Sequence, residues 1–281
     1  MSGGDEAPAE RQVADDSAGL SASSLFGGIG YGLVIAFLYA PLVLMVIFSF
    51  GGSTIQSFPI SDFTVHWYAD LGKDSGLMAA VQRSFIVATF VVLVSTVLGT
   101  AFAVELHYRH FLGSKFIELL LTLPLAMPSV VLGVVMVLGT EFIGIPSGLI
   151  RTVIGQSSFV MPVTLLLVLA RLRRIDPSLM EAAQDLGAGR ISSFFYVLLP
   201  LIKGSVIGGA LLGLTLSADD VMVSLFLAGP SQTLPIWVFN QMRFGFTPSV
   251  NAVFTILGII CLLMVVISTM VNRNWRPEKS A

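Results

Sequence analysis

Charged residues are scarce in this chain of 281 residues. Asp, Glu, Lys and Arg together make up 11% of it, against about 25% in an average soluble domain. Hydrophobic residues make up 55%. This balance excludes an ordinary soluble domain and predicts a membrane protein, so the useful count is one of membrane spans. The net charge of −2 gives no basis for a nucleic-acid partner.

Other absences narrow the function further. The single cysteine, Cys261, lies in an apolar run and cannot form an intrachain disulfide. The chain has no phosphate-binding loop of the G-x-x-x-x-G-K-[ST] type, which argues against ATP binding by this chain itself. The three histidines are not spaced like metal ligands. We therefore expect no metal site and no cofactor held by this chain itself.

Long apolar segments fill most of the sequence. A helix needs about 20 apolar residues to cross the hydrocarbon core of a bilayer. Residues 1–25 are polar, lack the basic flank of a secretory signal, and are expected to form a disordered tail. Residues 272–281 would form a second tail. We predict an all-α, multi-pass membrane domain over residues 26–271 with six transmembrane helices, at about 26–50, 78–106, 116–139, 153–171, 199–227 and 250–271.

The distribution of Lys and Arg predicts the orientation of these spans. Four basic residues fall on one side, namely Lys73, Arg83, Arg151 and Arg243. The other side holds eleven, namely Arg11, Arg109, Lys115, Arg171, Arg173, Arg174, Arg190, Lys203, Arg273, Arg276 and Lys279. Because basic residues favour the cytoplasm, we expect both termini there, together with the long loop of about 172–198 between the fourth and fifth spans.

That loop contains the polar stretch "EAAQDLGAGRISSFFYVLLP", which runs from Glu181 to Pro200. Asp176 followed by a proline is a typical helix start, and a short helix is expected over 177–186. Gly187 stands where a left-handed residue would end it, and a second short helix is expected from about Ser192 towards Pro200. The stretch has no histidine and no nucleophile beside a base. Its small residues and its caps favour docking into another protein and argue against catalysis.

The same stretch resembles the signature loop of bacterial ABC importer permeases. The shared pattern is E-A-A, three residues, G, nine residues, and then I-x-L-P, with valine here in place of the isoleucine. In that family the loop is the coupling helix, which sits in a cleft of the ATPase subunit. The resemblance implies that the residues contacting the ATPase are Glu181, Ala182, Ala183, Asp185, Gly187 and Pro200.

Two further stretches extend this resemblance over nearly the whole chain. "LPLAMPSVVLG" (123–133) looks like the start of the family's third span, and "LSADDVMVSLFLAGPSQTLPIWVFNQ" (216–241) looks most like the spermidine/putrescine permeases. The resemblance implies the type I importer fold in a bacterial inner membrane. It also implies three partners besides membrane lipid: an ATPase dimer that binds the ATP, a second homologous permease, and an extracytoplasmic solute-binding protein. The chain itself would not be an enzyme.

Asp219 and Asp220 are the strongest chemical feature inside a predicted span. Ionisable groups at membrane depth are costly and usually line an aqueous path. A pair of carboxylates would attract a polyamine and repel an anion. Two consecutive helical residues point about 100° apart, so only one can face a pore, and we favour Asp220. The alternative is that the helix ends at this point and that the pair is merely solvated.

Trp237 and Gln241 follow in a stretch that the family places near the outer gate. An aromatic ring can face a polyamine's charges through cation–π contacts, although tryptophans also commonly anchor proteins at the membrane interface. The fifth span is rich in glycine, which favours close packing either within the subunit or against another permease. Two rival functions stay open. One is the same machine with another cargo, such as ferric ion, sulfate, a sugar or an opine-like solute, and the other is an ion-coupled secondary transporter.

Overall fold

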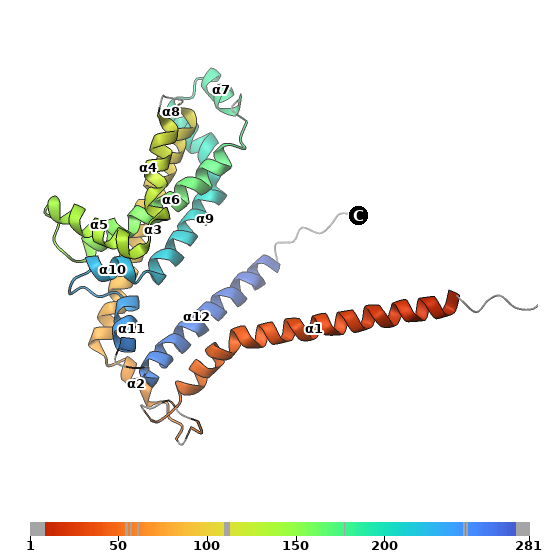
Figure 1. Ribbon diagram of the computed structural model, residues 1–281. Coiled ribbons are helices and arrows are strands. Elements are labelled where there is room, and N and C mark those ends of the chain that lie inside the picture. The colour runs from red at the N-terminus through yellow and green to blue at the C-terminus, as the bar shows by residue number, and fades with distance from the viewer. Residues whose placement is uncertain are drawn as a thin grey trace, which may run out of the picture. The chain divides into compact units, whose positions relative to one another are not determined.

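The computed structural model describes residues 9–53, 56, 58–60, 62–109, 113–176, 178–243, 245 and 247–273. Those residues are mainly helical, and the bridge between Gly51 and Phe63 is the one piece of β pairing found among them. The chain divides into two compact units, Met1–Leu71 with Phe246–Ala281 and Gly72–Gly245, which we describe separately. Figure 1 shows the order of the helices along the chain.

The first unit contains α1 (Ala9–Phe48), α2 (His66–Leu71) and α12 (Pro248–Arg273), and α12 contacts both of the others. Polar groups join the end of α1 to α2. The hydroxyls of Ser49 and Tyr68 lie 2.6 Å apart, and the Trp67 indole N–H donates to the Gly51 carbonyl at 2.8 Å. These bonds fix the turn that follows α1.

Helix α1 begins at Ala9, which corrects the expected disordered tail over residues 9–25; residues 1–8 lie outside the described part. The segment is polar, but Ala, Glu, Gln and Arg are strong helix formers. Extending a helix that already exists needs no new nucleation, so a polar stretch can continue an apolar span. Polarity therefore did not distinguish a helical extension from a disordered tail.

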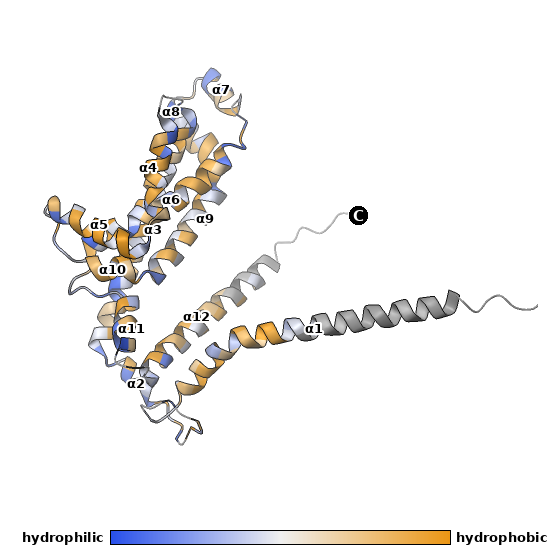
Figure 2. Cartoon of the chain, viewed as in Figure 1, coloured by the Kyte–Doolittle hydropathy of each residue, from blue (hydrophilic) through white to orange (hydrophobic). Residues whose placement is uncertain are grey.

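The second unit is built on three helices that pack against one another, α3 (Ser75–Tyr108), α6 (Leu149–Leu172) and α9 (Leu199–Asp219). Its buried core includes Ala103, Leu165, Val168, Leu169, Leu172, Leu198 and Ile202. A Cβ added at Gly209 would lie 2.9 Å from the Thr164 side chain, so α9 approaches α6 closely at this glycine. Apolar residues cover most of these helices, as Figure 2 shows.

Two of the predicted continuous spans are broken. The expected third span consists of α4 (Ser114–Ala126) and α5 (Ser129–Phe142), and the chain bends by 113° between them. Pro128 at the break has no N–H to donate and forces the preceding residue out of the helical region. The expected fifth span ends at Asp219, and a separate helix, α10 (Met222–Leu227), follows. Apolar composition therefore predicted the segments correctly but missed both breaks.

Four helical segments of the described residues are long and apolar enough to cross a bilayer: Gly30–Phe48, Ser75–Tyr108, Leu149–Leu172 and Arg190–Asp219. The bent α4–α5 pair could provide a fifth span. The apolar part of α12, Pro248–Met264, is shorter than the others. The described residues thus form a helical membrane protein with four or five apolar spans, and the predicted sixth segment, 250–271, lies within α12.

Candidate functional sites

The polar hairpin, residues 178–200, stands at one end of the second unit. It contains α7 (Ser178–Asp185), α8 (Arg190–Ser193) and the π-helical turn η1 (Phe194–Leu198), and it leads into α9. Figure 1 shows α7 and α8 at the end of the bundle opposite to α5 and α10. Five of the six predicted coupling residues are exposed, and Ala183 is half-buried. The helix backbone around these small side chains is therefore open to close approach by another surface.

Local hydrogen bonds fix both ends of α7. The Asp176 carboxylate accepts the Ser178 backbone N–H at 3.0 Å, and bonds from that N–H and from the Ser178 hydroxyl hold the pKa of Asp176 below its usual value. Pro177, expected as the first helical residue, lies outside the described part. At the other end Gly187 has φ +85°, and the Ala188 N–H donates to the Ala183 carbonyl at 3.0 Å. This is a Schellman cap, and it confirms the left-handed glycine that the sequence predicts.

The second half of the hairpin differs from the expected short helix. Residues 190–219 form one continuous helix, interrupted only by η1, in which the Leu199 N–H donates to the Phe194 carbonyl five residues earlier. Pro200 therefore lies in the first turn of α9, where the sequence placed it at a helix end. A proline within a helix lacks an N–H, and its ring crowds the carbonyl four residues back. The wider π turn relieves that conflict.

The inner face of the hairpin packs on the bundle, and several of its large apolar side chains stay exposed among the polar ones. Met180, Ile175 and Phe194 contact the core cluster that contains Leu172 and Leu198. On the outer side Leu186 is 89% exposed, and Ile191 and Tyr196 are exposed as well. These inner contacts join the hairpin to the core that α6 and α9 share.

The second site is the acidic helix break, residues 217–224, where α9 ends and α10 begins. Asp220 has extended backbone angles (φ −71°, ψ 117°), so the chain leaves the helix there. Its carboxylate accepts the backbone N–H groups of Val223 at 3.3 Å and Ser224 at 2.9 Å, and also the Ser224 hydroxyl at 2.7 Å. Asp220 thus caps the start of α10, and its carboxylate is hydrogen-bonded within the protein.

Gln156 on α6 completes this arrangement. Its side chain is 1% exposed. The amide nitrogen donates to the Asp220 carboxylate at 3.2 Å and to the Ser224 hydroxyl at 2.7 Å, and the amide oxygen accepts the Ser217 hydroxyl at 2.5 Å. The sequence analysis missed Gln156, and the available signal was a glutamine flanked by small residues within an apolar span.

Asp219 differs from its neighbour in exposure and in hydrogen bonding. It is exposed, and within the described residues its carboxylate has no hydrogen-bond partner. It lines a cavity of about 340 Å³ at which both helix breaks meet, since Met127 and Asp220 line it too. The other lining residues are mostly apolar, namely Pro124, Leu125, Ser129, Leu132, Phe159, Leu216, Val221, Met222 and Val223. Such a cavity can hold a cation that carries an apolar chain.

Trp237 and Gln241 are not brought to this cavity. Both lie on α11 (Leu234–Arg243), which packs against α3 and is fixed there by the Leu234 N–H donating to the Ser84 hydroxyl at 2.7 Å. Trp237 is only 8% exposed, and Gln241 is half-buried. The structure therefore joins the two aspartates in one site and places the two α11 residues elsewhere in the unit.

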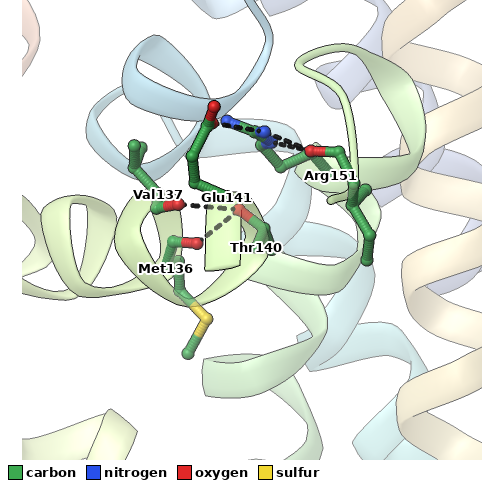
Figure 3. A network of polar contacts seen from close by, with 6 residues as sticks. Met136, Val137, Thr140, Glu141 and Arg151 are labelled. Carbon is green, nitrogen blue, oxygen red and sulfur yellow. Dashed lines mark hydrogen bonds and ion pairs between the residues drawn. The ribbon is translucent and has the colours of Figure 1, made fainter. Parts of the chain in front are cut away.

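A buried arginine holds the turn between α5 and α6. Figure 3 shows Arg151 reaching Glu141, to which it donates at 2.8 Å; its Nε also donates to the Ile145 carbonyl at 2.9 Å. The Arg151 side chain is 6% exposed and that of Glu141 is 71% exposed. In the part of the chain that the structure describes, no group of three or more acidic, His or Cys side chains could hold a metal ion. The hydrogen bonds of Arg151 therefore stabilise the turn between α5 and α6.

Comparison with known proteins gives a consistent result. Residues 95–278 match the family model described as binding-protein-dependent transport system inner membrane component. The spermidine/putrescine transport system permease protein PotC of Escherichia coli (strain K12) is 32% identical over 242 residues, which cover 86% of this chain and 91% of the relative. The putrescine transport system permease protein PotI of the same organism is 35% identical over 233 residues, which cover 80% and 83%.

The fold has close matches among solved structures as well. A chain of a bacterial ABC transporter that imports the acidic polysaccharide alginate superposes with a TM-score of 0.69, covering 95% of this chain and all of the other at 16% identity. A second structure shows the alginate transporter in complex with a periplasmic protein bound to an alginate pentasaccharide, and its TM-score is 0.67. At this level of identity the likeness concerns the fold alone.

Proposed function

The chain belongs to the family of binding-protein-dependent transport system inner membrane components, and on this premise we propose that it carries polyamines into the cytoplasm as the permease subunit of an ATP-driven importer. It is a permease and not an enzyme, in keeping with its relatives. The proposal concerns the cargo, the full set of spans, the partners and the residues at each site.

The proposed cargo rests on the Asp219 carboxylate, which has no hydrogen-bond partner among the described residues and lines a largely apolar cavity. A polyamine consists of ammonium groups joined by methylene chains. The carboxylate would attract an ammonium group, while the methylenes would pack against Leu125, Leu132 and Phe159. Two relatives named for spermidine and putrescine, at 32% and 35% identity, support the same cargo. An acidic polysaccharide would be repelled by this carboxylate, so the fold neighbours do not argue for alginate.

We further propose the six-span topology with both termini in the cytoplasm. The bent α4–α5 pair would be the third span, and α12 would be the sixth: its 26 residues reach about 39 Å at 1.5 Å per residue, enough for a hydrocarbon core of about 30 Å. The excess of Lys and Arg on one side sets the orientation. The permease domain would then cover residues 26–271, and residues 274–281 lie outside the described part.

The polar hairpin would be the contact with the ATPase. In this proposal a dimer of ATPase subunits holds the exposed helix α7 at Glu181, Ala182, Ala183 and Asp185, while Gly187 and Pro200 shape the hairpin behind it. Closure of the ATPase pair would move α7 and, through its buried contacts, α6 and α9. Asp219 lies at the far end of α9, about 30 Å from Leu199 at 1.5 Å per residue, so the same helix would link the ATPase to the cavity. A second permease and an extracytoplasmic binding protein would complete the pathway.

The deciding experiment is reconstitution of the complex with its ATPase, its partner permease and its binding protein in proteoliposomes. We expect putrescine or spermidine to stimulate ATP hydrolysis and to accumulate in the lumen, whereas ferric ion, sulfate and sugars should do neither. The polyamine assignment fails if one of those other solutes stimulates the complex and polyamines do not. Uptake that survives removal of the ATPase but collapses with the ion gradient would instead identify a secondary transporter.

A further inference from the structure

The two adjacent carboxylates at the helix break have unequal surroundings. The Asp220 carboxylate accepts four hydrogen bonds from groups of α6 and α10. Asp219, one residue earlier, has no such partner among the described residues and faces the cavity. A half-buried carboxylate needs donors to compensate for lost water, and Asp220 has them. The pair therefore does not act as one acidic site.

The hydrogen bonds around Gln156 form a chain with one consistent direction. The Ser217 hydroxyl donates to the Gln156 amide oxygen, the Gln156 amide nitrogen donates to Ser224 and Asp220, and the Ser224 hydroxyl donates to Asp220. An amide has one accepting end and one donating end, so this order fixes which way the side chain points. The chain ends on the Asp220 carboxylate, so each polar side chain in it has a hydrogen-bond partner.

Close packing holds α10 in place beside this network. A Cβ added to Gly155, next to Gln156, would lie 2.1 Å from Leu227 Cδ1, and one added to Gly133 on α5 would lie 2.7 Å from the ring of Phe226. Helix α10 is thus packed between α5 and α6 at two glycines. The hydrogen-bond network joins α6 to the end of α9 and to the start of α10, and so holds the break between these two helices.

We propose that Gln156 is a positioning residue for the transport path and that the two aspartates have separate tasks. Gln156 and Asp220 hold the helix break, and this places the Asp219 carboxylate in the cavity as the group that contacts the solute. The assignment reverses the sequence-based preference for Asp220, and it rests on the proposed transport function. It extends that function by naming the residue that sets the site's geometry and by assigning the cavity a single solute-binding charge.

An exchange of partners tests the proposal. Gln156→Glu places two carboxylates against each other, and Asp220→Asn can leave two amide nitrogens facing each other, so each single variant disrupts the network. The double variant Gln156→Glu/Asp220→Asn restores one donor and one acceptor, because asparagine can still cap α10 through its oxygen and donate to Glu at 156. In the reconstituted complex we expect each single variant to raise the half-saturating polyamine concentration about tenfold, as for loss of a hydrogen bond to a charged group. The double variant should recover most of this loss.

The outcomes separate the tasks of the two aspartates. If the solute binds Asp220 directly, the double variant stays as impaired as Asp220→Asn, and the proposal is overturned. Asp219→Asn should be impaired by itself and should not be rescued by Gln156→Glu. A purely structural role would lower the amount of complex and its maximal rate while leaving half-saturation unchanged, and that result would also overturn the proposal.

A thiol readout keeps this test independent of the cargo. Leu227→Cys, made in a chain in which the exposed Cys261 is serine, places a buried thiol on α10 that packs against Gly155 and replaces no hydrogen-bonding group of the network. We expect a water-soluble maleimide to modify this thiol slowly in the assembled complex, at least several-fold faster with Gln156→Glu, and slowly again in the exchanged double variant. Rates that do not respond to these changes refute the network, whereas responsive rates in a complex that ignores polyamines refute only the proposed cargo.

Discussion

Replacing Gly187 by alanine tests the docking role of the polar hairpin with a known physical cost. Gly187 has φ +85°, and a Cβ added there would meet nothing within 4 Å. The penalty is therefore backbone strain alone, roughly 1–2 kcal/mol for a residue with a Cβ in the left-handed region. Helix α7 has only 8 residues, and a helix this short is marginal without outside support. A penalty of this size lowers the ratio of folded to unfolded hairpin by about 5–30-fold.

The consequence should appear as weaker binding of the ATPase. A partner that recognises only the folded hairpin loses apparent affinity in proportion to the folded fraction. We expect Gly187→Ala permease to insert into membranes normally, to bind purified ATPase subunits up to about tenfold more weakly, and to show reduced solute-stimulated ATP hydrolysis. Binding can be measured by titrating the ATPase onto permease in nanodiscs.

Gly189 supplies the matched control. It lies in the same hairpin, a Cβ there would also meet nothing within 4 Å, and its backbone (φ −69°, ψ 164°) is one that alanine adopts freely. Gly189→Ala should therefore bind the ATPase like the wild type. Wild-type binding by Gly187→Ala, or an equal loss with Gly189→Ala, would refute the argument that the left-handed cap preserves the docking surface.

The remaining predictions concern the cavity, its surroundings and the start of α7. Asp219→Asn should raise the half-saturating polyamine concentration about tenfold with unchanged ATPase binding, as measured by uptake and titration. Arg151→Met should lower the free energy of unfolding of the purified permease by about 2–4 kcal/mol, because it removes the hydrogen bonds to Glu141 and to the Ile145 carbonyl. Glu141→Gln should cost under about 1 kcal/mol. Equal shifts in melting temperature for the two variants would contradict this. Because the pKa of Asp176 is lowered on folding, its contribution to stability is full above the ordinary value of 3.8 and is lost as the pH falls through the lower folded value. Asparagine is about as good a helix cap as aspartate, so Asp176→Asn should match the wild type in ATPase binding at pH 7. Because the amide does not titrate, the variant should also lack the part of the acid-induced loss of ATPase binding that comes from this cap.

The sequence predicted best what depends on neighbouring residues. The start of α7 and the left-handed Gly187 follow from a capping carboxylate and from a glycine placed after a short helical run, and both are present. The breaks were missed for the opposite reason. An apolar run around Met127 and Pro128 has the same composition whether it is one span or two helices with a bend of 113° between them. Only packing against the other helices distinguishes the two.

The distinct tasks of the aspartates could not be predicted from local pattern either. Asp220 and Gln156 are 64 residues apart, and no local sequence pattern near either residue predicts their contact. Helical periodicity suggested that one aspartate faces a pore but assumed that the helix continues. Because the helix ends, the angle of about 100° between successive residues no longer applies, and the side chain that is exposed is Asp219.

The break also separates two helix ends of opposite polarity, and this explains why it suits a cation. A helix carries a partial positive charge at its N-terminus and a partial negative charge at its C-terminus. The positive end of α10 is capped by Asp220. The last turn of α9 lines the cavity through Leu216 and Asp219. Its negative end and the Asp219 carboxylate, which has no hydrogen-bond partner in the described part of the chain, therefore act together on whatever occupies the cavity. Replacing Asp219 by asparagine removes only one of these two contributions, and the α9 end remains. We therefore expect that variant to keep a weaker preference for cations over anions.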